Sequence, residues 1–215
     1  ELAIGNTALD LLGQAQLWLN LAAETKNDGR DADKLAYLRD AGQYRNLLLV
    51  EQPNGDFAHT LTRQFFFDSF HYLLLDALAK SSNAAIAAIA AKAIKEVSYP
   101  LRRSRDWVIT LGDGSDESHR RMLIAIDNLW AYTGELFEMD SVDSELLDAG
   151  IAANLAYLRE PWLREINSTF AKATLTVPQN NWAQSGGKRG VHTEHLGFLL
   201  AEMQFLQRAY PNATW

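Results

Sequence analysis

Two acidic residues of the sequence are followed, three positions later, by a side chain that could share a metal with them. Asp68 precedes His71 in FFFDSFHYLLL, and Glu96 precedes Tyr99 in KEVSYPLRR. Residues i and i+3 lie on one face of a helix, so a carboxylate and an imidazole at this spacing can converge on one pair of metal ions. Di-iron helical bundles use this device, with Glu from two helices and Glu-x-x-His from the other two. The chemistry to test is therefore that of a di-iron site.

The metal-binding pattern is incomplete where Glu-x-x-His is expected. Asp10 is followed by Gly13, which has no side chain, and Glu96 is followed by Tyr99, whose phenol is a poor ligand for ferrous iron at neutral pH. Pro100 comes next, and its clash with the carbonyl group of Glu96 predicts a kink at the presumed metal level. The sequence thus predicts a degenerate site without metal, with the former ligand positions at Asp10, Gly13, Asp68, Glu96 and Tyr99.

If these acids converge in an apolar bundle, other groups have to replace the metal, because unpaired carboxylates are poorly solvated there. Arg103 lies one turn beyond Tyr99 on the same helical face. We expect a polar cluster in which Glu96 and Tyr99 bond to each other's neighbours or to Arg103, while Asp68 bonds to His71. The alternative is that the acids are unrelated and lie on solvated faces.

The elements that position these residues are predicted to be helices, which makes the protein all-α. Residues 57–80 carry apolar side chains nearly all round the helix, which predicts burial on several sides. The stretch 174–192 lacks helical periodicity, and at most Thr174–Val177 could form a strand. The expected helices span residues 2–24, 31–40, 44–52, 57–80, 83–111, 116–137, 145–149, 154–173 and 193–210.

Composition limits the class of protein. With 215 residues, 47% of them hydrophobic, the chain has enough material for one domain over residues 1–215. Cysteine is absent, which excludes disulfides and thiolate chemistry and fits a reducing cytoplasm. The formal charge of −7 disfavours nucleic-acid partners, and no apolar run approaches the roughly 20 residues that span a membrane. We expect a cytoplasmic protein that binds neither nucleic acid nor a membrane.

Several long blocks carry a family resemblance. They are NTALDLLGQAQ, NLLLVEQPNGDFAHT, KAIKEVSYPLRRSRDW, TGELFE, GGKRGVHTEHLG and LAEMQFLQR, and together they cover nearly the whole chain. In these blocks the chain closely resembles the C subunits of bacterial ring-1,2-phenylacetyl-CoA epoxidases, multicomponent monooxygenases of phenylacetate degradation. The resemblance implies a ferritin-like four-helix bundle with additional C-terminal helices. Since the sequence begins without methionine inside an apolar helical pattern, we expect the N-terminal helix of that bundle upstream of residue 1.

The resemblance also implies a role. C subunits are considered structural, and they pair with the A subunit, which carries the di-iron centre and oxidises the aromatic ring. We therefore expect a scaffold without an active site or cofactor of its own, in a hetero-oligomer with the A subunit and the other epoxidase components, or in a homodimer when alone. The apolar helix at residues 57–80 likewise favours a large interface with a chain of the same fold.

Two other functions remain open on the sequence alone. One is a metal-dependent oxygenase that uses the degenerate di-iron site. The other is a free-standing helical carrier of an aromatic or coenzyme A ligand. Metal analysis would separate the first from a scaffold, and co-purification with a partner would separate the second.

Two polar segments near the C-terminus could carry chemistry of their own. His192, Glu194 and His195 lie close together, but the histidines are three residues apart rather than four as in a zincin helix, so we expect capping and packing, with Thr193 as N-cap. The GGKRG loop is expected to be flexible and solvated, although its Lys188 and Arg189 could contact a partner or a coenzyme A phosphate.

Overall fold

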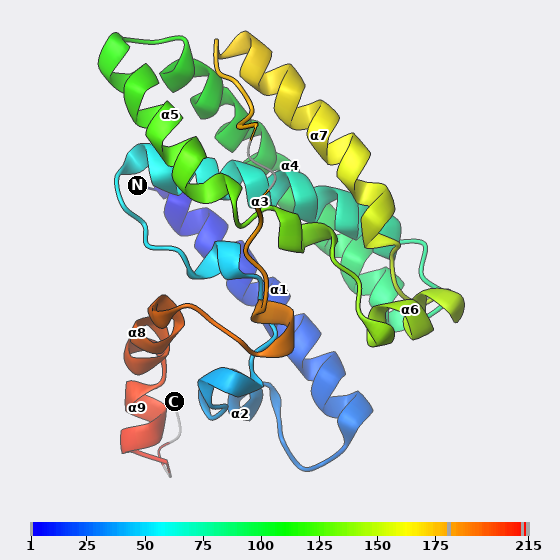
Figure 1. The fold of residues 1–215 in the computed structure, drawn as a ribbon. Helices are drawn as coiled ribbons and strands as arrows, with labels where there is room; N and C mark the ends of the chain where they lie inside the picture. The colour runs from blue at the N-terminus through cyan, green and yellow to red at the C-terminus, as the bar shows by residue number, and fades with distance from the viewer. Residues whose placement is uncertain (1, 180–181, 212, 214–215) are drawn as a thin grey trace. The chain divides into compact units, whose positions relative to one another are not determined.

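The computed structural model describes residues 2–179, 182–211 and 213 and divides into two compact units (Figure 1). Unit 1 comprises residues 1–51 and 186–215, and unit 2 comprises residues 52–185. The regular structure of the described residues is helical, without a strand, so the all-α class is confirmed. The organisation of residues 1–215 as a single domain stays a prediction.

Unit 2 is built from four long helices that pack on one another. Helix α3 (Phe57–Leu78) contacts α4 (Ala84–Gly112), α5 (Asp116–Trp130) and α7 (Leu155–Lys172), and α4 also contacts α5 and α7. The short elements η3 (Gly134–Phe137) and α6 (Ser141–Asp148) connect α5 to α7. Helix α3 is therefore the central element of this unit.

Side-chain caps define where the long helices begin. An N-cap side chain satisfies backbone N–H groups that have no partner within the helix. The carboxylate of Asp56 accepts from the backbone N–H of His59 at the start of α3. The amide oxygen of Asn83 accepts from the backbone N–H of Ala85 at the start of α4. Ser115 and Asn154 cap α5 and α7 in the same way.

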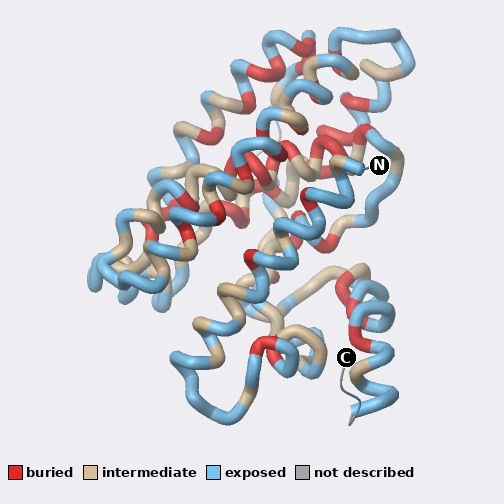
Figure 2. The backbone as a smooth tube through the Cα atoms, turned by 180° about the vertical axis from the view of Figure 1, so that it is seen from behind, coloured by how far each residue is buried: buried red, intermediate tan, exposed pale blue. Residues whose placement is uncertain are grey.

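The core of unit 2 lies around α3. Figure 2 shows buried residues where the helices of unit 2 face one another. Phe65 and Phe66 are fully buried, as predicted for a helix covered on several sides. The ring of Phe66 lies 5.8 Å from that of Trp162 between centroids, and the indole N–H of Trp162 donates to the carbonyl oxygen of Phe66 at 3.0 Å. This contact fixes α7 on α3 through both burial and a hydrogen bond.

Unit 1 joins the beginning and the end of the chain. Helix α1 (Leu2–Lys26) contacts α2 (Ala32–Tyr37). Helix α8 (Glu194–Met203) contacts α9 (Phe205–Ala209) and two short turns from the early part of the chain. The short 3-10 elements of this unit are η1 (Ala41–Gln43), η2 (Leu48–Glu51) and η4 (Gly187–Arg189).

Several predicted elements differ from those observed. The helix predicted over 116–137 ends at Trp130, where the hydroxyl of Thr133 donates to the carbonyl oxygen of Trp130 and ends the regular pattern. The helix predicted over 193–210 is divided at Gln204. Residues 44–52 form only a 3-10 turn at Leu48–Glu51. No strand forms at 174–177, where Thr174 has a φ of 55° that is incompatible with extended backbone.

Helix α4 continues through Pro100 instead of ending there. A proline inside a helix removes one hydrogen bond and usually kinks the helix. The flanking turns hold the helix by burial, since Val97 is 3% and Leu101 8% exposed. Tertiary packing therefore outweighs the local cost, and the kink itself stays a prediction.

Candidate functional site

Asp68 is the acidic residue at the centre of unit 2. It lies on α3 and is 2% exposed. Its Oδ1 accepts from the amide of Gln64 at 2.5 Å, and its Oδ2 accepts from the hydroxyl of Ser104 on α4 at 2.9 Å. Burial raises the pKa of Asp68 to about 7, although these two hydrogen bonds and the charge of Arg103 lower it. The carboxyl group therefore exchanges its proton near neutral pH while both its oxygens are held by protein donors.

The predicted hydrogen bond between Asp68 and His71 is wrong. The Nδ1 atom of His71 is buried without a hydrogen-bond partner, and its ring lies 5.1 Å from that of Phe67. Helical side chains lean towards the N-terminus, so Asp68 meets Gln64, one turn earlier, rather than His71. Burial lowers the pKa of His71 to about 4, so the imidazole is neutral at pH 7.

The other predicted members of the cluster lie on α4. Tyr99 is 49% exposed, and the guanidinium carbon of Arg102 lies 5.8 Å from its ring centroid. Among the described residues, no hydrogen bond or ion pair joins Arg103 to Glu96 or Tyr99, so the expected bonds to Arg103 are wrong. The alternative, in which Glu96 and Tyr99 bond to each other's neighbours, stays a prediction. Arg103 acts instead through its charge, which lowers the pKa of Asp68. Two helical turns separate Glu96 from Arg103, about 10 Å of rise, and this explains the missing contact.

The remaining positions of the predicted site lie on α1 in unit 1. Asp10 is exposed there, and a Cβ atom added at Gly13 would meet nothing within 4 Å. Asp10 belongs to unit 1, whereas Asp68 and Glu96 belong to unit 2, and the convergence of the three acids stays a prediction.

The donor set of unit 2 does not fit a di-iron group. Both oxygens of Asp68 accept protein hydrogen bonds, and the side chain of Tyr99 is half exposed beside Arg102. In the part of the chain that the structure describes, no three His, Cys, Asp or Glu side chains are grouped so that they could hold a metal ion. The arrangement is a hydrogen-bonded link between α3 and α4.

A second buried acid, which the sequence analysis did not single out, organises unit 1. Glu51 is 3% exposed, and its Oε1 accepts from the amide of Asn46 at 2.8 Å and lies 2.6 Å from the Nδ1 atom of His192. Its Oε2 accepts from both the backbone N–H and the hydroxyl of Thr193, at 2.8 and 2.7 Å. A carboxylate at the end of the apolar run LLLVE was the signal that could have identified it.

This network assigns His192 to packing, as the sequence predicted. Its Nε2 atom lies 3.1 Å from the carbonyl oxygen of Tyr44, so both ring nitrogens have protein partners. Thr193 occupies the N-cap position of α8, but its side chain makes no cap hydrogen bond because its hydroxyl donates to Glu51. Glu51 therefore ties the start of α8 to the segment before unit 2.

The GGKRG loop packs closely against residue 46, and its expected flexibility stays a prediction. A Cβ atom at Gly187 would lie 2.1 Å from the carbonyl oxygen of Asn46, so only glycine permits this approach. Gly190 has a φ of 80°, and its surroundings include Arg45. Lys188 is half-buried and Arg189 exposed, and both have interactions within the protein. Their contact with a partner or with coenzyme A stays a prediction.

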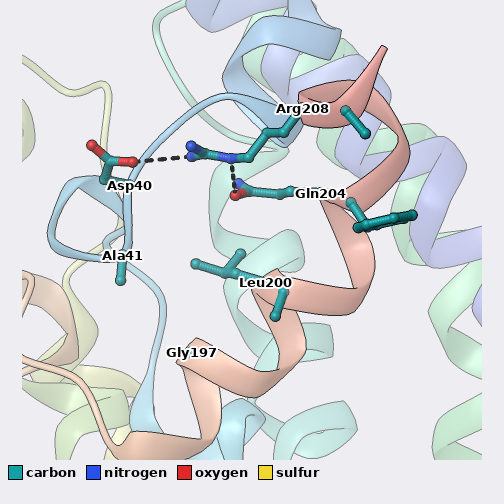
Figure 3. Close-up of a pocket in the computed structure, with 9 residues that line it drawn as sticks. Asp40, Ala41, Gly197, Leu200, Gln204 and Arg208 are labelled. Atoms are coloured by element: carbon teal, nitrogen blue, oxygen red, sulfur yellow. Dashed lines mark hydrogen bonds and ion pairs between the residues drawn. The ribbon is translucent and has the colours of Figure 1, made fainter. Parts of the chain in front are cut away.

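Unit 1 also contains an open groove of about 530 Å³ between η1 and the helices α8 and α9 (Figure 3). At one end, the guanidinium of Arg208 donates to Asp40 at 3.0 Å and to the amide oxygen of Gln204 at 2.8 Å. The amide nitrogen of Gln204 donates to the carbonyl oxygen of Arg39. The polar side chains of the groove are therefore bonded to one another or to backbone, and its remaining lining is mainly apolar: Ala41, Leu200, Ala201, Phe205 and Ala209.

Comparison with known proteins agrees with the blocks recognised in the sequence. Residues 1–215 match the family model described as phenylacetic acid catabolic protein, and this family is ferritin-like. A similar protein is the C subunit of the 1,2-phenylacetyl-CoA epoxidase from Escherichia coli strain K12, which is 50% identical over 215 residues. The matched region covers 100% of this chain and 86% of that relative. The resemblance to C subunits and the ferritin-like helical fold are thereby confirmed.

Proposed function

Because the chain belongs to the phenylacetic acid catabolic protein family, we propose that it is a non-catalytic subunit of a phenylacetyl-CoA epoxidase. It scaffolds the oxygenase subunit, which carries the di-iron centre, during aerobic phenylacetate catabolism. The observation that carries this proposal is the use of Asp68, the buried acid of the expected metal level, as a hydrogen-bond acceptor for Gln64 and Ser104. On this proposal Asp68 stands at a former ligand position and now joins α3 to α4.

Unit 1 supports a scaffolding role because it leaves large apolar side chains uncovered. On α1, Leu9 is 67% and Leu12 63% exposed. On α8 and α9, Phe198 is 70% and Phe205 64% exposed. Large uncovered apolar patches are typical of protein interaction surfaces. We therefore assign the partner contact at least in part to these helices.

The proposal also includes the place of the protein. None of the described helices is long and apolar enough to cross a membrane. We propose that the subunit works in the cytoplasm, together with the A subunit and the other epoxidase components, without nucleic acid.

The test combines metal analysis with reconstitution. The purified chain, loaded anaerobically with ferrous iron, is expected to retain less than one iron per chain and to oxidise no phenylacetyl-CoA. Mixed with the oxygenase subunit, it is expected to sediment as a complex, and the complex with Asp68→Asn is expected to turn over like wild type. Asp106→Asn, at an exposed position of α4, is the matched control.

Two results would overturn the proposal. Two irons per chain with an oxo-bridge absorption band would make the chain a metal oxygenase. Loss of turnover in the complex with Asp68→Asn, with no loss of stability and with unchanged complex formation, would give Asp68 a direct catalytic role.

A further inference from the structure

A second cavity lies within unit 2, away from Asp68. It has a volume of about 460 Å³, and its walls come from the α5–η3 turn, from α7 and from the loop residues 177–179 and 182–183. This volume falls in the range of small-molecule sites, roughly 300 to 1,000 Å³. The side chains that decide its chemistry are Trp130, Phe137, Arg159, Trp162 and Trp182.

The floor of this cavity is aromatic and firmly held. The rings of Trp130 and Trp162 lie 5.7 Å apart between centroids and are inclined by 33°. The ring of Phe137 meets Trp162 edge-on at 5.4 Å. Trp162 is 1% exposed, and its indole N–H is already engaged by the carbonyl oxygen of Phe66. Because Trp162 is buried behind the cavity wall, a flat ring entering the cavity would meet the half-buried rings of Trp130 and Phe137, on which it can stack.

The loop wall is attached to the α5–η3 turn. The backbone N–H of Gln184 donates to the carbonyl oxygen of Ala131 at 2.7 Å. A Cβ atom at Gly134 would lie 2.7 Å from the Cβ atom of Ala183, so the absence of a side chain at Gly134 allows the loop to approach this closely. The cavity is thus bounded by backbone contacts on this side, independently of any ligand.

One cationic side chain lines the cavity. Arg159 is an exposed residue of α7, and within the described part of the chain its guanidinium has no hydrogen bond or ion pair. No acidic side chain lines the cavity among the described residues. A guanidinium recognises a carboxylate through two parallel N–H donors, which gives both affinity and orientation.

We propose that this cavity binds a planar aromatic carboxylate, whose ring packs on Trp130 and Phe137 while its carboxylate pairs with Arg159. The ring and the charge both contribute, because the half-buried aromatic rings offer stacking and Arg159 is the cationic side chain among the described lining residues, beside the polar side chains of Thr133 and Gln179. The proposal is independent of the scaffolding role, since a subunit without catalytic function can hold a small ligand and a scaffold can lack one.

The test uses 2-naphthoate as the probe for the isolated chain. Binding is followed by isothermal titration and by saturation-transfer NMR. We expect saturable one-site binding, about fivefold weaker for 2-naphthalenemethanol, which lacks the charge, and at least tenfold weaker for cyclohexanecarboxylate, which lacks the aromatic ring. Arg159→Gln is expected to raise the Kd for 2-naphthoate about fivefold, in line with a partly exposed ion pair, and to leave the Kd for 2-naphthalenemethanol unchanged.

Arg164→Gln is the matched control, because Arg164 is also an exposed arginine of α7 but does not line the cavity. It should leave the Kd for 2-naphthoate unchanged. Absence of binding at millimolar 2-naphthoate, equal affinity for the neutral alcohol, or equal effects of Arg159→Gln and Arg164→Gln would each overturn the proposal. None of these outcomes bears on complex formation with the oxygenase subunit, so failure of the site and failure of the scaffolding role are distinguishable.

Discussion

Replacing Asp68 by Asn should remove a large pH dependence of stability. Burial raises the pKa of Asp68 from the ordinary 3.8 to about 7 in the folded protein. The unfolded chain therefore loses this proton near pH 4, whereas the folded chain keeps it until about pH 7. Between these values the folded state binds more protons, so the contribution of Asp68 to stability falls as pH rises and is constant above about pH 7.

The size of this effect follows from the interval between the two pKa values. At about 1.4 kcal/mol per pKa unit, Asp68 should lower the free energy of unfolding by roughly 4 kcal/mol between pH 4 and pH 8. Total stabilities are commonly about 5 to 15 kcal/mol, so the change is large enough to measure.

Asparagine can keep both hydrogen bonds of Asp68 without taking a charge. Its amide oxygen can accept from Ser104, and its amide nitrogen can donate to Gln64 once the Gln64 amide turns over. We therefore expect Asp68→Asn to match wild type near pH 4 and to exceed it by up to roughly 4 kcal/mol at pH 8.

The assay is urea unfolding at several pH values, followed by tryptophan fluorescence, because the fully buried Trp162 reports on unit 2. The quantity compared is the difference in unfolding free energy between variant and wild type, so that titration of other groups cancels. Asp106→Asn, at an exposed position, should give a difference that does not change with pH. A pH-independent difference for Asp68→Asn would refute the reasoning, as would a variant less stable than wild type at every pH.

Three further substitutions test the packing. Gly187→Ala should lower stability by more than about 1 kcal/mol in thermal unfolding, because its Cβ atom would lie 2.1 Å from the carbonyl oxygen of Asn46; an unchanged Tm would contradict that approach. Trp162→Phe leaves the carbonyl oxygen of Phe66 without its indole donor and should cost about 1 to 3 kcal/mol in urea unfolding. Faster amide hydrogen exchange in α7 would show that the lost hydrogen bond, and not only the smaller ring, causes the loss. Glu51→Ala strands the buried donors around it and should cost about 3 to 5 kcal/mol, with faster hydrogen exchange at the start of α8; protection equal to wild type would show that the carboxylate does not hold that helix.

Local sequence determined most of the helices and where they begin. Apolar periodicity predicted α3 and α4 to within a few residues, because periodicity acts over one or two turns. The all-round apolar character of residues 57–80 likewise predicted that Phe65 and Phe66 would be buried. Family membership was also readable from the sequence blocks alone.

The partners of the polar residues were decided by tertiary structure. The spacing of Asp68 and His71 places both on one helical face, but it does not show that Ser104 on α4 supplies a hydroxyl to the same carboxylate. In the same way, Glu51 and His192 are 141 positions apart, and only folding of unit 1 brings them to 2.6 Å. Sequence spacing fixes angles within one helix, whereas a buried polar group takes whichever donor the neighbouring element presents, because leaving it unpaired costs more than any local preference.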